Sequence, residues 1–202
     1  MAKILILFAH PVLEKSRVQS ELYRRITAME GVTVNDLYQV YPDFDIDVAR
    51  EQQLLLDHDV IIWQHPFYWY SAPALLKQWI DLVLQHGWAY GENGDRLRGK
   101  IIFNAISAGG REEAYGEGGL HQYAVAEFLK PFEQTALLCG MEYWPPFVIH
   151  GTHLMQIPDI QLHAIQFEEL LLALKNERIA AGELENIRYL NELSPISKPL
   201  MS

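Results

Sequence analysis

WQHPFYWYSAPALLKQWIDLVLQHGWAY, residues 63–90, joins the end of an apolar strand to an amphipathic helix. Ser71 is the expected N-cap, and Pro73 suits the first helical turn because its missing N–H has no partner there. Lys77 and Asp81 are expected to pair on the wet face. The apolar face carries Leu76, Trp79, Ile80, Val83 and Leu84. A strand that runs into aromatic residues and then into such a helix is typical of an α/β protein.

Three short apolar runs predict buried parallel strands, because they are rich in β-branched residues and do not alternate with polar ones. They are Ile4–Phe8, Val60–Trp63 and Ile101–Ile106, with Val32–Val34 and Tyr143–Ile149 as weaker candidates. Helical patterns lie between them, near Ser16–Met29, Ala49–Leu56, Pro73–Leu84, Leu120–Leu138 and about Ile160–Leu193, with Gly182 as a candidate break. This alternation predicts an α/β fold with a doubly wound sheet of five parallel strands and helices on both faces. We expect a single domain over residues 1–193 and a loosely ordered C-terminal tail over 194–202.

Charge and cysteine content narrow the class of protein. The net charge is −10 over 202 residues, which argues against nucleic acid as a partner, because binding a duplex requires Lys and Arg to neutralise phosphates. Cys139 is the only cysteine, and its apolar neighbours predict a buried side chain rather than a nucleophile. No apolar segment approaches the roughly 20 residues of a bilayer span, and residues 3–8 are too short for a signal peptide. We therefore expect a cytoplasmic protein.

The loop after the first strand, residues 9–17, is a candidate phosphate site. It has neither the G-x-G-x-x-G fingerprint nor the P-loop pattern. Ser16 is the expected N-cap of the next helix, whose first N–H groups would be free to bind an anion beside His10 and Arg17. The alternative is a capped helix with a solvated arginine.

The loop after the strand at Val60 places Pro66 before four aromatic residues, Phe67, Tyr68, Trp69 and Tyr70. Four adjacent rings do not all fit one core, so some are exposed or face a ligand. A concave site lined by rings suits a flat, partly apolar ligand. The alternative is an oligomer interface, and both roles are compatible.

The loop after the strand at Ile101 is rich in glycine. It begins Ser107, Ala108, Gly109 and Gly110, and paired glycines let backbone N–H groups approach a ligand closely. Further along it, Tyr115 and His121 supply a phenol and an imidazole, which suit proton transfer. The alternative is a flexible loop without chemistry.

The remaining histidines offer no metal site. His150 and His153 have metal-like spacing, but no third ligand lies near them in sequence, which favours a structural use. His58 and His163 are predicted to lie at the surface. The sequence therefore predicts no metal site.

Taken together, the three loops resemble the flavodoxin-like NAD(P)H:quinone oxidoreductase family of the DT-diaphorase type over residues 3–150. The strongest signature is P-x-x-W-[FY]-x-x-P-x-x-L-K-x-W at residues 66–79, followed by Ala89-Tyr90 and by G-G-x4-Y-x5-H at residues 109–121. Residues 37–47, LYQVYPDFDID, and 86–91, HGWAYG, resemble the ancillary subunits of glutathione-gated potassium-efflux systems, which are themselves FMN-dependent quinone reductases.

The resemblance implies a role for each matching position. The flavin phosphate and ribityl chain would be held by His10, Ser16, Arg17, Val18 and Gln19. The isoalloxazine would be lined by the residues from Pro66 through Phe67, Tyr68, Trp69 and Tyr70. Ser107, Ala108, Gly109 and Gly110 would bind its pyrimidine edge, and Tyr115 and His121 would be catalytic. Family members are homodimers with shared sites, so the aromatic wall would double as interface.

Two positions depart from the family pattern. Gln19 stands where Asn is usual, and Ser107-Ala108 replaces a Thr-Thr pair, which removes one hydroxyl beside the flavin. The resemblance still implies FMN as cofactor, with FAD as the alternative, and NAD(P)H as co-substrate. The implied reaction is two-electron reduction of a quinone or a similar small aromatic acceptor by a ping-pong mechanism.

The resemblance also leaves a second function open. In that alternative the chain is a regulatory subunit of a potassium-efflux transporter, held through that partner at the inner face of the cell membrane, with catalysis secondary. A one-electron flavodoxin carrier is a third hypothesis, less favoured because a carrier has no use for a Tyr–His pair.

Overall fold

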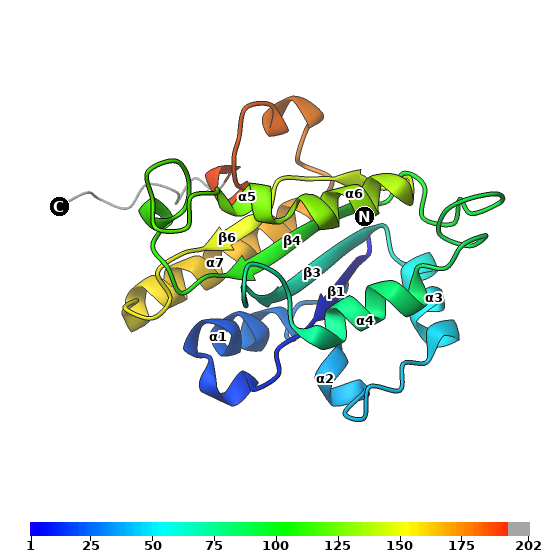
Figure 1. Ribbon diagram of the computed structural model, residues 1–202, viewed down its shortest axis with the longest axis horizontal. Helices are drawn as coiled ribbons and strands as arrows, with labels where there is room; N and C mark the ends of the chain where they lie inside the picture. The colour runs from blue at the N-terminus through cyan, green and yellow to red at the C-terminus, as the bar shows by residue number, and fades with distance from the viewer. Residues whose placement is uncertain (194–202) are drawn as a thin grey trace.

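The computed structural model describes residues 1–193, so the predicted tail over 194–202 lies outside the described residues. The described part is a parallel sheet with helices on both sides (Figure 1). The strands are β1 (Ile4–Phe8), β2 (Val32–Asp36), β3 (Val60–Pro66), β4 (Ile101–Ser107), β5 (Glu142–Tyr143) and β6 (Phe147–Ile149). The helices are α1 (Arg17–Ile26), α2 (Leu37–Val40), α3 (Val48–Asp57), α4 (Ala74–Val83), α5 (Val125–Phe128), α6 (Lys130–Leu138) and α7 (Ile157–Lys175).

The strands lie in the order β2-β1-β3-β4-β5, with β6 also paired to β4, and every pair is parallel. The chain therefore leaves β1 for β2 on one side and returns to β3 on the other. In an open parallel sheet, the carboxyl ends of the strands at such a reversal of order form a ligand-binding crevice. The predicted doubly wound sheet is confirmed.

The fifth strand position holds two short strands instead of the single one predicted over Tyr143–Ile149. Strand β5 pairs with β4 at Ile101 and Ile102, and β6 pairs with β4 three residues further along. Pro145 and Pro146 lie between β5 and β6, and proline has no N–H to donate to the ladder. The sheet thus has six strands at five positions.

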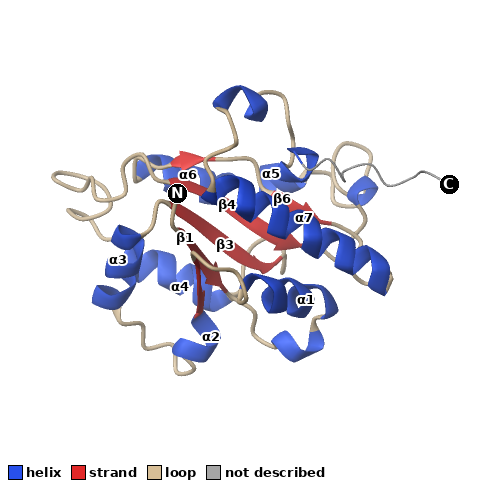
Figure 2. Ribbon diagram, turned by 180° about the vertical axis from the view of Figure 1, so that it is seen from behind, coloured by secondary structure: helices blue, strands red, loops and turns tan. Residues whose placement is uncertain are grey.

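Successive residues of β1 point into two separate cores, which explains why its sequence is apolar without alternation. Ile4, Ile6 and Phe8 pack with apolar residues of α1 and α7. Leu5 and Leu7 pack with residues of α3, α4 and α6 on the opposite face. Figure 2 shows α7 crossing the sheet on one side, with α4 on the other.

Helix α4 has the predicted apolar face, and its Lys77 pairs with Asp81 as expected. Its start differs from the prediction, since the N-cap is Pro73 and no side chain caps it. Ser71 lies two residues before that N-cap, in a tight turn where its backbone exchanges hydrogen bonds with Tyr68.

The prediction of a helix over Leu120–Leu138 was wrong in its first part. Residues 120–124 form a loop, and the helix is divided between α5 and α6 at Leu129. Helix α7 ends at Lys175, where Glu177 adopts a positive φ of 53°, so the break comes before Gly182. Only short 3-10 turns follow, at Ala181–Leu184 and Leu190–Leu193.

The predicted burial of Cys139 is confirmed, whereas the predicted exposure of two histidines is not. Cys139 is buried as expected, and burial raises the pKa of its thiol to about 11. The surface prediction for His58 was wrong, because its ring nitrogens lie 2.6 Å from the Leu54 carbonyl oxygen and 2.7 Å from the Thr33 hydroxyl. His163 is half-buried, with Nδ1 at 2.9 Å from the amide oxygen of Gln166.

Candidate functional site

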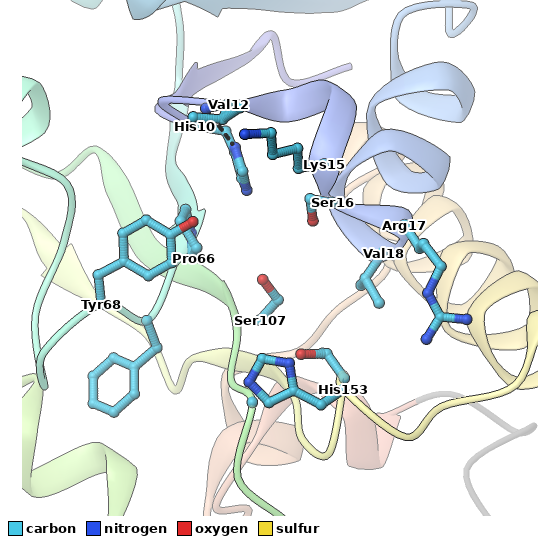
Figure 3. Close-up of a pocket in the computed structure, with 13 residues that line it drawn as sticks. His10, Val12, Lys15, Ser16, Arg17, Val18, Pro66, Tyr68, Ser107 and His153 are labelled. Carbon is cyan, nitrogen blue, oxygen red and sulfur yellow. Dashed lines mark hydrogen bonds between the residues drawn. The ribbon is translucent and has the colours of Figure 1, made fainter.

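A pocket of about 410 Å³ lies at the carboxyl ends of β1, β3, β4 and β6 (Figure 3). The loop after β1 and the start of α1 contribute His10, Val12, Lys15, Ser16, Arg17 and Val18. The loop after β3 contributes Pro66, Phe67 and Tyr68, the loop after β4 contributes Ser107 and Gly109, and the loop after β6 contributes Thr152 and His153. All three loops singled out in the sequence meet at one edge of the sheet.

The N-terminus of α1 opens into this pocket. Ser16 is its N-cap, as predicted, and the Ser16 hydroxyl accepts a hydrogen bond from the Gln19 N–H at 3.2 Å. Helix geometry leaves the N–H groups of Arg17 and Val18 without intrahelical acceptors. Together with the helix dipole and the cationic side chains of Lys15 and Arg17, they suit a phosphate group.

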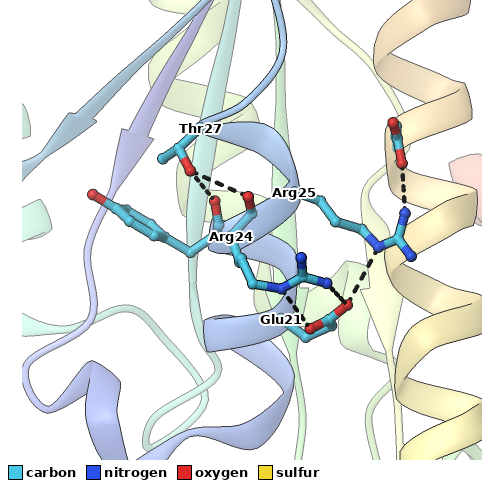
Figure 4. Close-up of polar contacts among 6 residues, drawn as sticks. Glu21, Arg24, Arg25 and Thr27 are labelled. Carbon is cyan, nitrogen blue, oxygen red and sulfur yellow. Dashed lines mark hydrogen bonds and ion pairs between the residues drawn. The ribbon is translucent and has the colours of Figure 1, made fainter.

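Ion pairs on α1 hold the helix that carries this terminus (Figure 4). Glu21 accepts from Arg24 at 2.6 Å and from Arg25 at 3.3 Å. Arg25 also reaches across to Glu168 of α7 at 2.8 Å. At the other end of α1, the Arg17 guanidinium donates to the Met155 carbonyl at 3.0 Å, which fixes the helix against the loop after β6.

His10 is buried at the edge of the pocket and points into it (Figure 3). Its Nδ1 accepts a hydrogen bond from the Val12 N–H at 3.2 Å, so the neutral ring carries its proton on Nε2. Burial lowers the pKa of His10, and nearby Glu14 opposes that shift. His10 therefore presents a neutral N–H donor to a ligand.

The aromatic loop divides its rings between the pocket and the outside. Phe67 and Tyr68 line the pocket, whereas Trp69 is 91% exposed and neither Trp69 nor Tyr70 lines it. The reason is the tight turn in which Tyr68 and Ser71 exchange backbone hydrogen bonds of 3.1 and 2.9 Å. The two central residues have positive φ values of 47° and 63°, which L side chains rarely adopt. Strain of this kind is concentrated at functional sites.

A side chain at either glycine after β4 would meet a neighbouring ring. A Cβ on Gly109 would lie 2.2 Å from Nε2 of His153, and one on Gly110 would lie 3.1 Å from the Tyr115 ring. Gly109 lines the pocket, whereas Gly110 does not, and Ala108 is fully buried with its N–H bonded to the Ile149 carbonyl.

Tyr115 and His121 lie together next to the pocket without lining it. Their rings are stacked with centroids 4.4 Å apart, and the Tyr70 hydroxyl lies 3.4 Å from Nδ1 of His121. Tyr115 also packs on Phe67 at 6.0 Å, which connects the pair to the pocket wall. Burial raises the pKa of Tyr115, with Tyr70 adding to the rise and the Gly110 backbone opposing it. A protonated phenol is thereby held beside an imidazole.

Gln19 is placed differently from the other residues proposed for the phosphate. It is buried, and its amide donates to the Ser107 hydroxyl at 2.9 Å and accepts from the Gln64 side chain at 2.9 Å. Gln19 thus lies beneath the pocket, where it orients Ser107 instead of facing the ligand space.

Sequence reasoning missed Val12, Lys15, Thr152 and His153 as pocket residues. His153 was considered only through its spacing from His150, yet the two rings diverge, since His150 packs between Tyr115 and Tyr189 at 5.5 and 5.6 Å. Among residues 1–193, no group of three or more His, Cys, Asp or Glu side chains is arranged to hold a metal ion. In the same part of the chain, no helix is both long and apolar enough to cross a bilayer.

The pocket combines a helix end suited to an anion, a backbone edge at Ser107 and Gly109, and an aromatic wall of Phe67 and Tyr68. This donor set fits a phosphorylated ligand with a flat ring system, as in a flavin mononucleotide. The pair of Tyr115 and His121 adds a group able to exchange protons beside that ring.

Several known proteins are similar to this chain in sequence and fold. The glutathione-regulated potassium-efflux system ancillary protein KefF of Klebsiella aerogenes is 44% identical over 84% of this chain and 94% of its own length. A crystal structure of general stress protein 14 from Treponema denticola, in complex with FMN, is 40% identical with a TM-score of 0.79, covering 85% of this chain and 99% of that one. An NADPH-quinone reductase from P. pentosaceus is 34% identical with a TM-score of 0.75, covering 83% and 96%. A family model described as flavodoxin-like fold matches residues 2–171, and the chain therefore belongs to the family with the flavodoxin-like fold.

Proposed function

We propose that this protein is an FMN-dependent NAD(P)H:quinone oxidoreductase. The observation that carries the proposal is the pocket itself, which joins the N-terminus of α1 at one end to Tyr68 and, through Phe67, to the Tyr115–His121 stack at the other. Relatives whose names include FMN and NADPH-quinone reductase support the choice of cofactor and reaction.

When bound, FMN would supply the chemistry for two-electron (hydride) transfer between NAD(P)H and a quinone. Its phosphate would be held by the N–H groups of Arg17 and Val18, the Ser16 hydroxyl and the cationic side chains of Lys15 and Arg17. The backbone of Ser107 and Gly109, which line the pocket, would bind the polar edge of the ring. Phe67 and Tyr68 would pack against its apolar part and exclude water.

Proton transfer falls to the stacked pair. The phenol of Tyr115 keeps its proton at neutral pH, since burial raises its pKa further above the ordinary value of about 10. His121, in contact with both Tyr115 and Tyr70, is placed to exchange a proton with the bound acceptor. The two side chains balance the charge that builds up at the site during hydride transfer.

We also propose that a second copy of the chain covers the exposed aromatic turn. Trp69 is 91% exposed, Leu120 82% and Tyr123 56%. Tyr70 and Tyr123 both contact Phe128, with ring centroids at 4.8 and 5.7 Å, so these rings form one patch beside the site, and Trp69 is the residue next to Tyr70. Apolar patches of this kind mark interaction surfaces. Sedimentation of the purified protein tests this, with a homodimer as the expected species.

The alternative function is regulation of a potassium-efflux transporter by the flavin-loaded protein. The KefF relative favours it. Such a protein would work in the cytoplasm or at the inner face of the membrane through its partner. Co-purification with a potassium antiporter, together with full transporter activation by the Tyr115→Phe/His121→Ala double variant, would favour regulation over catalysis.

One absorbance experiment tests the main proposal. The purified protein is expected to show flavin bands that bleach on addition of NADPH or NADH and return on addition of a quinone. Mass analysis of the released cofactor distinguishes FMN from FAD. A colourless protein whose melting temperature does not respond to either flavin would refute the proposal.

A further inference from the structure

We propose that the loop after β6, residues 150–156, is a fourth wall of the flavin site and that His153 is a flavin-binding residue. This inference rests on the proposed function and extends it to a residue that the sequence pattern assigned to no ligand. The loop provides Thr152 and His153 to the pocket lining, next to Ser107 and Gly109.

The loop is fixed to the rest of the site by backbone hydrogen bonds. The N–H groups of Gly151 and Thr152 donate to the carbonyls of Gly110 at 2.8 Å and Ala108 at 3.1 Å. At its far end, Met155 accepts from the Arg17 guanidinium at 3.0 Å. The loop therefore bridges the glycine edge of the pocket and the phosphate-binding start of α1.

The position of the His153 ring depends on the missing side chain of Gly109. A Cβ on Gly109 would lie only 2.2 Å from Nε2 of His153, so the imidazole packs directly against the Gly109 backbone. Figure 3 shows the ring at the pocket wall on the side of Ser107. Because His153 is otherwise exposed, its position owes little to burial in the core.

The chemistry of this position suits the polar edge of a flavin ring. An imidazole both donates and accepts hydrogen bonds, and the pyrimidine edge of a flavin offers carbonyl oxygens and an N–H group. His150, three residues earlier, does not compete for this role, because its ring is directed at Tyr115 and Tyr189. The spacing of the two histidines therefore serves two different contacts.

The first test measures the flavin dissociation constant from the change in flavin fluorescence when the flavin-loaded protein is serially diluted. His153→Ala is expected to weaken FMN binding by about tenfold, the equivalent of one hydrogen bond of roughly 1.4 kcal/mol. Leu154→Ala is the matched control, since Leu154 is 68% exposed on the same loop and does not line the pocket. It is expected to stay within twofold of the wild-type protein.

The outcomes separate this inference from the proposed function. If wild-type protein holds FMN and His153→Ala holds it equally well, the inference fails and the proposed function stands. If wild-type protein holds no flavin, the proposed function fails first. An unchanged melting temperature of flavin-free His153→Ala excludes misfolding as the cause of weaker binding.

The second test concerns the contact between His153 and Gly109. Gly109→Ala places a methyl group where the imidazole lies, so it is expected to displace His153 and weaken FMN binding by a similar factor. The Gly109→Ala/His153→Ala double variant is then expected to bind no more weakly than the weaker single variant. If the two losses of FMN affinity multiply in the double variant, Gly109 and His153 act independently and this contact does not position the imidazole.

Discussion

The rings of Tyr115 and His121 are stacked face to face, with centroids 4.4 Å apart and planes inclined by 24°. The loop between them closes on itself, because the His121 N–H donates to the Ala114 carbonyl at 2.9 Å. A Cβ on Gly119 would lie 2.6 Å from that same carbonyl oxygen, so the closure requires glycine. Contacts within their own loop thus hold the two rings together.

We expect His121→Ala to lower quinone turnover by about 100-fold while flavin stays bound, because proton transfer by a positioned side chain contributes roughly that factor. The pair stands next to the pocket and not in its lining, so its loss should leave the cofactor in place. Steady-state kinetics and the flavin-to-protein ratio measure the two effects. Loss of flavin in this variant would show that His121 is structural.

The hydrogen bond between Gln19 and Ser107 links two positions that depart from the family pattern. Gln19→Ala leaves the buried Ser107 hydroxyl and Gln64 amide without that partner, and we expect a loss of about 2 kcal/mol in the free energy of unfolding. A double-mutant cycle with Ser107→Ala should give a coupling energy of about 1 kcal/mol. Urea unfolding measures both, with Gln53→Ala on the exposed face of α3 as control. Strict additivity would mean that the contact contributes nothing.

Trp69→Asn should stabilise the monomer by about 1 kcal/mol, because asparagine tolerates the positive φ of 47° better than tryptophan does. The same change should weaken the proposed dimer, since it removes the most exposed ring of the patch. Thermal unfolding at a protein concentration below the dissociation constant of the dimer measures the stability of the monomer, and sedimentation measures dimer formation. A less stable monomer would show that the Trp69 ring makes contacts that outweigh the strain of its backbone.

His65 should make the fold acid-sensitive. Complete burial lowers its pKa from 6.5 to about 4, so between these values the unfolded chain binds a proton that the folded chain does not. Stability from this residue is present above pH 6.5 and is lost as the pH falls toward 4, by roughly 3 kcal/mol at 1.36 kcal/mol per unit. Urea unfolding at several pH values measures the slope. His65→Gln should show a shallower slope than the wild-type protein, and an equal slope would contradict the assignment.

Much of the fold was readable in the sequence because its signals are local. The run Ile4–Phe8 predicts a buried strand with the observed bounds, since its β-branched residues carry no polar face. Ser16 predicts its own helix start, because an N-cap acts within three residues. The boundaries that failed depended on other parts of the chain. Ser71 lies in a turn with Tyr68 and does not cap the helix. The segment at Leu120 is a loop, in which His121 stacks on Tyr115.

The site divides in the same way. The sequence by itself determined which loops to expect at the pocket, because a capped helix start, paired glycines and clustered rings can each be recognised within a few residues. Only the tertiary structure decided that Gln19 lies under Ser107, 88 residues away, that Trp69 turns outward, and that His153 rests on Gly109. The parallel register of β1, β3, β4 and β6 brings these chain ends to one edge of the sheet. No local window of sequence contains that register, since it is set by pairing between strands tens of residues apart.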